Sequence, residues 1–461
     1  MENLIVVIYL AAVLIVGMLA GRRMKGLEDF AVAGRSFGSL VIFATLSASF
    51  IGGGFSMGNA EKVFLVGISN IVALWGFSLK EVLVGLFIAP RLERYPDAIS
   101  IGDIMEPHYG KAARIFSGVF GVVLCAGIMG AQVSAMGYIF NIFLGLDRLT
   151  GILVGCGIVI AYSTVGGMRA VIWTDVIQFV VLAVGIPLTL YFGISEAGGW
   201  ESVAGTVPAG HLMLSSEPSG LLSLAALFIT FMLGETLVPP YVQRLLIGRD
   251  TTEVSRGTIL SGIFSVPFFA VTGLVGLVAL AIDPNLNPNL AMPFVIRESL
   301  NPIMQGVMIA AIVSIIMSSA DSFLNGAAIS FSNDLFKPLY GKPMQPASEL
   351  LVARIVTLLT GVLSILFALS IESVLDILIY AYGFWAPTVV PPLCAAILGF
   401  RATPGRFAGG ATAGIGAALV WNSLLHAPFG VDGLVVGSIT NLLVFFAIPG
   451  GNGRHCSFSR R

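Results

Sequence analysis

Long apolar stretches separated by short polar connections dominate this sequence. A helix needs about 20 predominantly apolar residues to cross the hydrocarbon layer of a bilayer, and it satisfies its own backbone hydrogen bonds there. The sequence therefore predicts an all-α integral membrane protein with about 13 transmembrane helices. Their expected limits are 4–21, 37–59, 67–90, 115–145, 149–166, 171–194, 219–240, 257–282, 303–330, 351–371, 375–399, 407–425 and 432–449.

The composition excludes several classes of protein. Hydrophobic residues make up 56% of the 461 residues and charged residues 11%, whereas about a quarter of the residues in soluble domains are charged. A net charge of −1 argues against the basic face that binds nucleic acid, so no nucleic-acid partner is expected. No span holds a nucleophile–base pair or a metal motif, so we do not expect an enzyme.

The basic residues are distributed unevenly between the two sides of the predicted spans. With the N-terminus outside, all of the 24 Lys and Arg residues except Lys62, Lys80, Arg148 and Arg297 fall in segments on the inner side. Cytoplasmic loops are enriched in lysine and arginine. The sequence thus predicts a multi-pass protein of the cell (plasma or inner) membrane, with an outside N-terminus and a cytoplasmic C-terminus.

Two of the predicted spans are interrupted. Residues 43–55 contain three consecutive glycines, each of which costs about 1 kcal/mol in a helix relative to alanine. Residues 233–240 contain Glu235 and end in two prolines. These interruptions head successive blocks of five spans, as in an inverted-repeat transporter that binds ions and solute at its broken helices. For the glycine run, a small-residue surface for close helix packing stays open as the alternative.

Hydroxyl and carboxyl side chains gather in the span 303–330. A charge inside a span costs at least about 2.5 kcal/mol on insertion scales, so such residues usually face a cavity or a partner. Hard oxygen ligands suit a sodium ion, and residues four apart share a helix face. Serines bonded back to their own helix are the structural alternative. The group comprises Ser314, Ser318, Ser319, Asp321 and Ser322.

Other charges also fall inside spans. Asp175 is interpreted as an ion or gating residue, with a helix cap or an ion pair with Arg169 as the alternatives. Lys80 and Glu81 are adjacent and point in different directions on a helix, so a pair between them is not assumed. Lys80 could instead snorkel, bind an anionic group of a solute, or neutralise Glu61 or Glu235.

Two motifs connect these residues to a known family. The run GGMRAVIWTDVIQ at 166–178 closely resembles the signature of the sodium:solute symporter family. The run MSSADSFL at 317–324, followed by NDLF at 333–336, looks like that family's sodium-binding helix. The resemblance covers most of the chain and implies a LeuT-like fold of two inverted five-helix repeats. One polytopic domain over 1–461 is expected, with a leading helix at 4–21, repeats at 37–194 and 219–399, and two trailing helices within 407–449.

The resemblance also implies ion sites. The main sodium site of the family uses backbone carbonyls and two adjacent hydroxyls, which here belong to Ala48, Ile51 and Ile315, and to Ser318 and Ser319. Some members bind a second sodium near the signature aspartate, and its ligands here would be Asp175, Asp321 and Ser322. Sodium is thus the expected coupling ion, and no organic cofactor is expected.

The high-affinity choline transporter branch is the nearest look-alike within that family, through residues 52–55 and the MSSADS run. Choline requires an aromatic cage for its quaternary ammonium. The positions that match this cage are Phe50, Ile128 and Val238, of which one is aromatic, so choline is not expected. An amino acid or a carboxylate is favoured instead. The candidate solute contacts are Thr45, Ser47, Phe50, Gln132, Glu235 and Lys80.

The resulting hypothesis is sodium-coupled secondary active symport, in which a small organic solute enters the cell by alternating access. Coupling requires sodium to favour the state that binds solute, and solute must tighten sodium binding to the same degree. Two other hypotheses stay open at this point. One is a proton-coupled carrier of the same fold, in which Asp175 or Asp321 titrates, and the other is a membrane sensor that does not transport.

Overall fold

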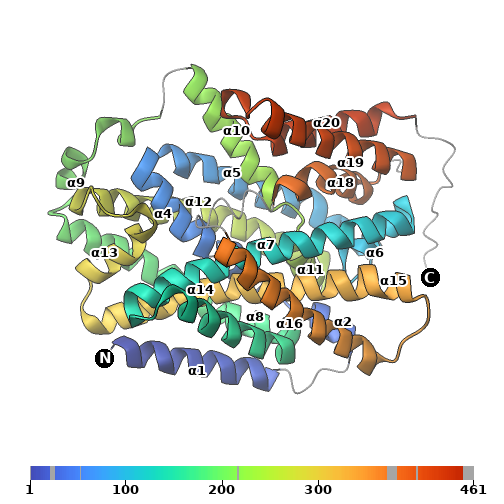
Figure 1. Cartoon of the computed structure of the whole chain (residues 1–461), viewed down its shortest axis with the longest axis horizontal. Helices are drawn as coiled ribbons and strands as arrows, with labels where there is room; N and C mark the ends of the chain where they lie inside the picture. Colours follow the sequence, from blue (N-terminus) through green and yellow to red (C-terminus); the bar gives the residue numbers. More distant parts are fainter. Residues whose placement is uncertain are drawn as a thin grey trace.

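The chain forms a helical bundle in which most of the long helices lie roughly along one direction (Figure 1). The computed structural model describes residues 2–20, 26–51, 53–214, 218–370, 382–400 and 403–449. An isolated parallel β-bridge joins Phe37 to Gly248.

The helices of the first part of the chain are α1 (Glu2–Ala20), α2 (Leu27–Val32), α3 (Ser39–Phe50), α4 (Gly53–Val66), α5 (Ser69–Leu83), η2 (Val84–Ile88), η3 (Ala89–Arg94), α6 (Ile101–Tyr109), α7 (Lys111–Leu144), α8 (Arg148–Glu196), α9 (Trp200–Thr206) and η4 (Ala209–Leu212). Those of the second part are α10 (Pro218–Gly234), α11 (Pro239–Leu246), α12 (Thr251–Ile282), η5 (Pro288–Leu290), α13 (Ala291–Ser299), α14 (Pro302–Ile329), η6 (Ser330–Phe336), α15 (Lys337–Tyr340), α16 (Pro346–Ser370), α18 (Val390–Leu398), α19 (Pro404–Leu419), η7 (Val420–Leu424), η8 (Pro428–Gly430) and α20 (Gly433–Ala447).

Several of these helices are long enough to cross a membrane. Within the described residues, 6 helical runs have the necessary length and apolar character, and the number rises to 8 if each of two bent helix pairs counts as one span. Shorter apolar helices lie at Leu4–Leu19 and Gly433–Ala447. The chain is therefore a multi-pass helical membrane protein, as the sequence predicts. Residues 375–381 of the expected span 375–399 lie outside the described residues.

Helix α8 contains two of the predicted spans. Helical structure runs from Arg148 to Glu196, but Gly167 has φ 53° and ψ −161°, which interrupts the helix between the expected spans 149–166 and 171–194. This positive φ is available to glycine without steric cost. The helix thus changes direction eight residues before Asp175.

Helix α14 lies at the centre of the bundle. Every residue from Met308 to Ile329 is buried, and the helix packs against α1, α7, α8 and α16. Outer helices instead expose apolar side chains, such as Leu359 and Leu363 on α16. Hydroxyl and carboxyl groups on α14 are consequently held in the protein interior, where they require polar partners.

Candidate functional site

Two broken helices lie where the sequence predicts interruptions. The pair α3 and α4 bends by 50° at the glycine run. Gly53 begins α4, and Gly52 lies outside the described residues. The pair α10 and α11 bends by 57°. Pro239 and Pro240 begin α11, and proline cannot continue the hydrogen-bond ladder of a preceding helix. Leu237, in the connection, has φ 52°, a left-handed conformation that is strained for a branched residue.

The serines of α14 face the end of α3. The Ser319 hydroxyl donates to the backbone carbonyl of Ser49 at 2.7 Å. The hydroxyl oxygens of Ser318 and Ser49 are 3.1 Å apart, and Ser318 also donates to Asp175 Oδ1. This arrangement brings hydroxyl, carbonyl and carboxylate oxygens from three separate helices, α3, α8 and α14, to one buried place.

The predicted carbonyl ligands lie around the same place. The Ile51 carbonyl accepts a hydrogen bond from the Ser56 hydroxyl at 2.7 Å, and Ala48 and Ile315 are buried. Ser49, which follows Ala48, supplies the carbonyl that contacts Ser319. The assignment of Ala48, Ile51 and Ile315 as sodium ligands stays a prediction.

An arginine that the sequence places among the inner-side basic residues is buried in this cluster. Arg244 and Asp175 both have 0% side-chain exposure, and Arg244 Nη2 lies 2.9 Å from Asp175 Oδ2. The guanidinium also donates to Thr45 Oγ1 at 3.0 Å and to Ser49 Oγ at 2.6 Å. Asp175 is therefore paired with Arg244, and Arg169 instead donates to the Ala33 carbonyl at 3.3 Å.

The second predicted sodium site is part of the same network. Ser322 accepts a hydrogen bond from Arg244 and donates to Asp321 Oδ1 at 3.1 Å. Tyr162 donates to Asp321 Oδ2 at 2.6 Å. Asp175, Asp321 and Ser322 are thus close together, as expected, but a positively charged side chain lies between Asp175 and Ser322.

Lys80 lies in a different cluster, among aromatic rings. Its ammonium is 2.6 Å from Glu81 Oε1, and the two side chains are 2% and 0% exposed. The nitrogen lies 3.9 Å from the Phe77 ring centroid and 4.4 Å from that of Tyr241. Lys80 and Glu81 therefore form a buried pair, although adjacent positions on a helix do not predict one.

Only some of the remaining solute candidates belong to these clusters. Phe50 packs edge-on against Tyr241, with ring centroids 5.1 Å apart, and so belongs with Lys80. Thr45 donates to Asp175 and so belongs to the cluster around Arg244 and Asp175. Ser47 donates to Ser261 at 3.2 Å. Gln132 is buried, and in the part of the chain that the structure describes its side-chain carbonyl oxygen has no hydrogen-bond partner.

Glu235 lies at the break between α10 and α11. Tyr382 donates to its Oε1 at 2.5 Å, whereas its buried Oε2 has no hydrogen-bond partner among the described residues. The indole nitrogen of Trp385 donates to the carbonyl of the next residue, Thr236, at 3.1 Å. Neither Tyr382 nor Trp385 could be assigned from the sequence, because they lie about 150 positions away along the chain.

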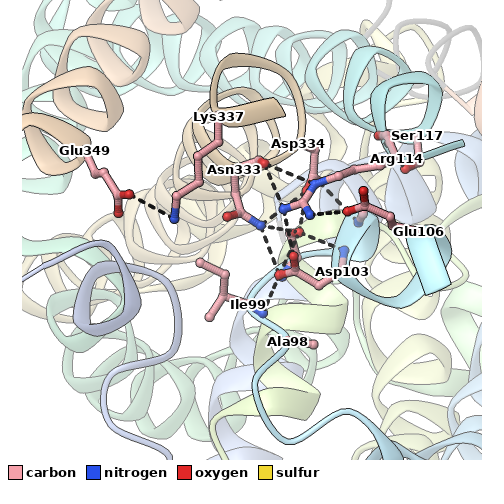
Figure 2. Close-up of polar contacts among 12 residues, drawn as sticks. Ala98, Ile99, Asp103, Glu106, Arg114, Ser117, Asn333, Asp334, Lys337 and Glu349 are labelled. Atoms are coloured by element: carbon pink, nitrogen blue, oxygen red, sulfur yellow. Dashed lines mark hydrogen bonds and ion pairs between the residues drawn. The ribbon is translucent and has the colours of Figure 1, made fainter. Parts of the chain in front are cut away.

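A polar cluster also surrounds η6, which follows α14 directly and carries the NDLF motif (Figure 2). Arg114 Nη2 is 2.7 Å from Asp103 Oδ1, and Arg114 Nη1 is 2.5 Å from Glu106 Oε2. The same guanidinium donates to the Asn333 carbonyl at 2.9 Å. A pocket of about 690 Å³ adjoins this cluster, lined in part by Asp103, Arg114 and Asn333. The cluster joins η6 to α6 and α7.

Known proteins share both the sequence pattern and the fold. The chain is 25% identical to the high-affinity proline transporter PutP of Bacillus subtilis, over 94% of each protein. It is 26% identical to the high-affinity choline transporter 1 of Drosophila melanogaster, over 83% of this chain and 63% of the relative. A Na⁺-coupled sialic acid symporter superposes with a TM-score of 0.83 at 22% identity, with 97% of each chain covered.

A second solved structure extends the fold comparison. Mhp1, a nucleobase-cation-symport-1 family transporter in a closed conformation, superposes with a TM-score of 0.59 at 14% identity, over 91% of this chain and 93% of Mhp1. These neighbours support the LeuT-like fold expected from the sequence. The family model described as the sodium:solute symporter family matches residues 30–414, which include both broken helices and the three polar clusters around Asp175, Lys80 and Arg114. The chain therefore belongs to the sodium:solute symporter family.

Proposed function

We propose that this protein is a sodium-coupled secondary active symporter that imports a small organic solute by alternating access. The observation that carries the proposal is the contact of Ser319 with the Ser49 carbonyl at 2.7 Å, beside Ser318 and Asp175. A hydroxyl pair on α14 facing the end of a broken helix supplies the hard oxygen ligands that sodium requires. The names of two relatives, a proline transporter and a sodium/proline symporter of Haemophilus influenzae, support the same function.

The main sodium ion would bind between α3 and α14. Its proposed ligands are the carbonyls of Ala48, Ile51 and Ile315 and the hydroxyls of Ser318 and Ser319. Sodium would replace the hydrogen bond between Ser319 and the Ser49 carbonyl with ion contacts. In doing so it would hold α3 against α14 and stabilise the outward-open state.

A second sodium near Asp175, Asp321 and Ser322 would have to compete with Arg244. The guanidinium contacts Asp175 at 2.9 Å, and two like charges cannot share this buried carboxylate without a large electrostatic cost. Arg244 lies on α11, the second half of a broken helix. Movement of α11 would withdraw the guanidinium and leave Asp175 and its hydroxyl neighbours for the ion.

The proposed architecture has 13 spans, with inverted repeats at 37–194 and 219–399, an outside N-terminus and a cytoplasmic C-terminus. The two bent helix pairs, α3 with α4 and α10 with α11, support the repeats because each heads one of them. Because Arg244 is buried, it no longer counts among the basic residues of the inner side. Most lysines and arginines still fall on that side, so the predicted orientation is unchanged.

Uptake into proteoliposomes tests the proposal. We would offer labelled amino acids, carboxylates, sugars and quaternary amines under an inward sodium gradient or an equal potassium gradient, for the wild type and for Ser318→Ala. Uptake that requires sodium and is lost in the mutant supports sodium symport. Uptake that follows a proton gradient and is unchanged by Ser318→Ala would instead favour the proton-coupled carrier.

A further inference from the structure

The non-helical connection between α10 and α11, which contains Glu235, is a candidate binding site for the solute. Residues 235–238 lie between α10 and α11, with Leu237 at φ 52° and with Trp385 donating to the Thr236 carbonyl. Strained backbone of this kind persists where the surrounding structure holds it, and it is concentrated at functional sites. Tyr382 and Trp385 thus hydrogen-bond to this connection, and Tyr382 contacts one oxygen of the Glu235 carboxylate.

The second carboxylate oxygen of Glu235 has no partner in the described residues. Glu235 is 3% exposed, Tyr382 satisfies Oε1, and Oε2 accepts no hydrogen bond. A buried carboxylate oxygen without a donor is costly, so a ligand that brings an N–H donor and a positive charge gains from binding there.

Lys80 already interacts with groups other than Glu235. Lys80 is paired with Glu81 at 2.6 Å and lies over the rings of Phe77 and Tyr241, while Tyr241 donates to Glu81 Oε2 at 2.9 Å. Lys80 and Glu81 act on Glu235 with opposite signs. Lys80 is thus held by Glu81 and the aromatic rings, and within the described residues no side chain donates to Oε2 of Glu235.

From this geometry we propose that Glu235 binds a protonated amine of the transported solute. The solute is then a primary or secondary amine, such as an amino acid, and the site rejects simple carboxylates and sugars, which bring no positive charge to Oε2. Lys80 serves as a fixed counter-charge to Glu81 and does not contact the solute. This inference rests on the proposed function, because it assumes that a solute binds at the broken helices.

Matched pairs of solutes test the inference on the full chain in proteoliposomes under a sodium gradient. The pairs are proline with cyclopentanecarboxylate and alanine with propionate. In each pair the first compound carries an amine, and the second has a similar carbon skeleton and carboxylate without it. Uptake, and competition for uptake, should be confined to the amines. Glu235→Gln should weaken amine affinity by about 10- to 100-fold, the effect of one charge-assisted hydrogen bond, and Glu235→Asp should weaken it less. Glu201→Gln, on the exposed surface of α9, is the matched control.

Sodium-dependent thermal stabilisation of the same variants separates this inference from the proposed function and from misfolding. Sodium should stabilise Glu235→Gln as much as the wild type, with half-saturation at the same sodium concentration. Transport of the deaminated compounds, amine uptake that survives Glu235→Gln, or amines without effect on uptake and stability would overturn the inference while leaving sodium binding intact. A mutant defect in sodium affinity alone would make Glu235 an ion ligand and would also overturn it. Loss of sodium stabilisation in the wild type would refute the proposed function itself.

Discussion

The ion pair between Asp175 and Arg244 gives the most specific stability prediction. Both side chains are fully buried and their charged atoms are 2.9 Å apart. Replacing Asp175 with Asn leaves the guanidinium buried among neutral acceptors, namely the hydroxyls of Thr45, Ser49 and Ser322. Breaking a buried pair in this way costs roughly 3–5 kcal/mol, so Asp175→Asn should be strongly destabilised.

Arg244→Gln should behave differently, because Asp175 keeps hydrogen bonds from Thr45, Ser49 and Ser318. The carboxylate that is left can also bind sodium. A ligand at about 100 times its dissociation constant stabilises the folded state by about 2.7 kcal/mol. The stability lost in Arg244→Gln should therefore be large in potassium buffer and mostly recovered in sodium buffer. Sodium should restore the stability of Asp175→Asn much less.

Unfolding of the wild type, both single variants and the double variant would be followed in detergent by circular dichroism, in sodium and in potassium. The double variant should lose less stability than the two single variants lose together, because it leaves neither the guanidinium nor the carboxylate of this pair without its partner. Additivity of the two substitutions within about 0.5 kcal/mol, or equal rescue of both single variants by sodium, would refute the reasoning.

Three further predictions concern packing, the end of α14 and pH. A Cβ added at Gly276 would lie 2.1 Å from the Ala60 carbonyl oxygen, whereas one at Gly416 meets nothing within 4 Å. Gly276→Ala should therefore lower the free energy of unfolding by about 1–3 kcal/mol, and Gly416→Ala should not lower it, as measured by thermal unfolding. Arg114→Gln removes contacts to Asp103, Glu106 and the Asn333 carbonyl, so amide exchange across η6 should accelerate relative to the exposed control Arg256→Gln. Burial, with the charge of Arg94, lowers the pKa of His108 from 6.5, so the unfolded chain binds the proton more readily and the free energy of unfolding should fall as the pH drops below about 6.5. His108→Asn should flatten that profile, and an unchanged profile would contradict it.

The sequence predicts the helices and their interruptions because both depend on local composition. Runs of apolar residues, the glycines at 52–54 and the prolines at 239 and 240 mark spans and breaks without reference to the rest of the chain. The buried polar pairs could not be predicted in this way. Arg244 meets Asp175 across 69 positions, and Tyr382 meets Glu235 across 147, so tertiary packing alone brings them together.

Lys80 illustrates the same limit within one helix. Neighbouring helix positions diverge, so a pair with Glu81 is not expected from spacing. The aromatic rings of Phe77 and Tyr241 confine the long lysine side chain, and burial makes its attraction to Glu81 stronger than it would be in water. Ser318 and Ser319, by contrast, could be singled out from the sequence, because both belong to one motif on one helix.

Equilibrium binding of radioactive sodium to the purified protein tests the central claim most directly. Ser319→Ala removes the hydroxyl that contacts the Ser49 carbonyl, and Ser438→Ala, which removes a buried hydroxyl on α20, is the matched control. The account predicts saturable sodium binding to the wild type and the control, and binding weakened at least about tenfold in Ser319→Ala, the loss expected for one ligand of a charged group. Sodium binding of equal affinity in all three proteins would contradict a sodium site between α3 and α14.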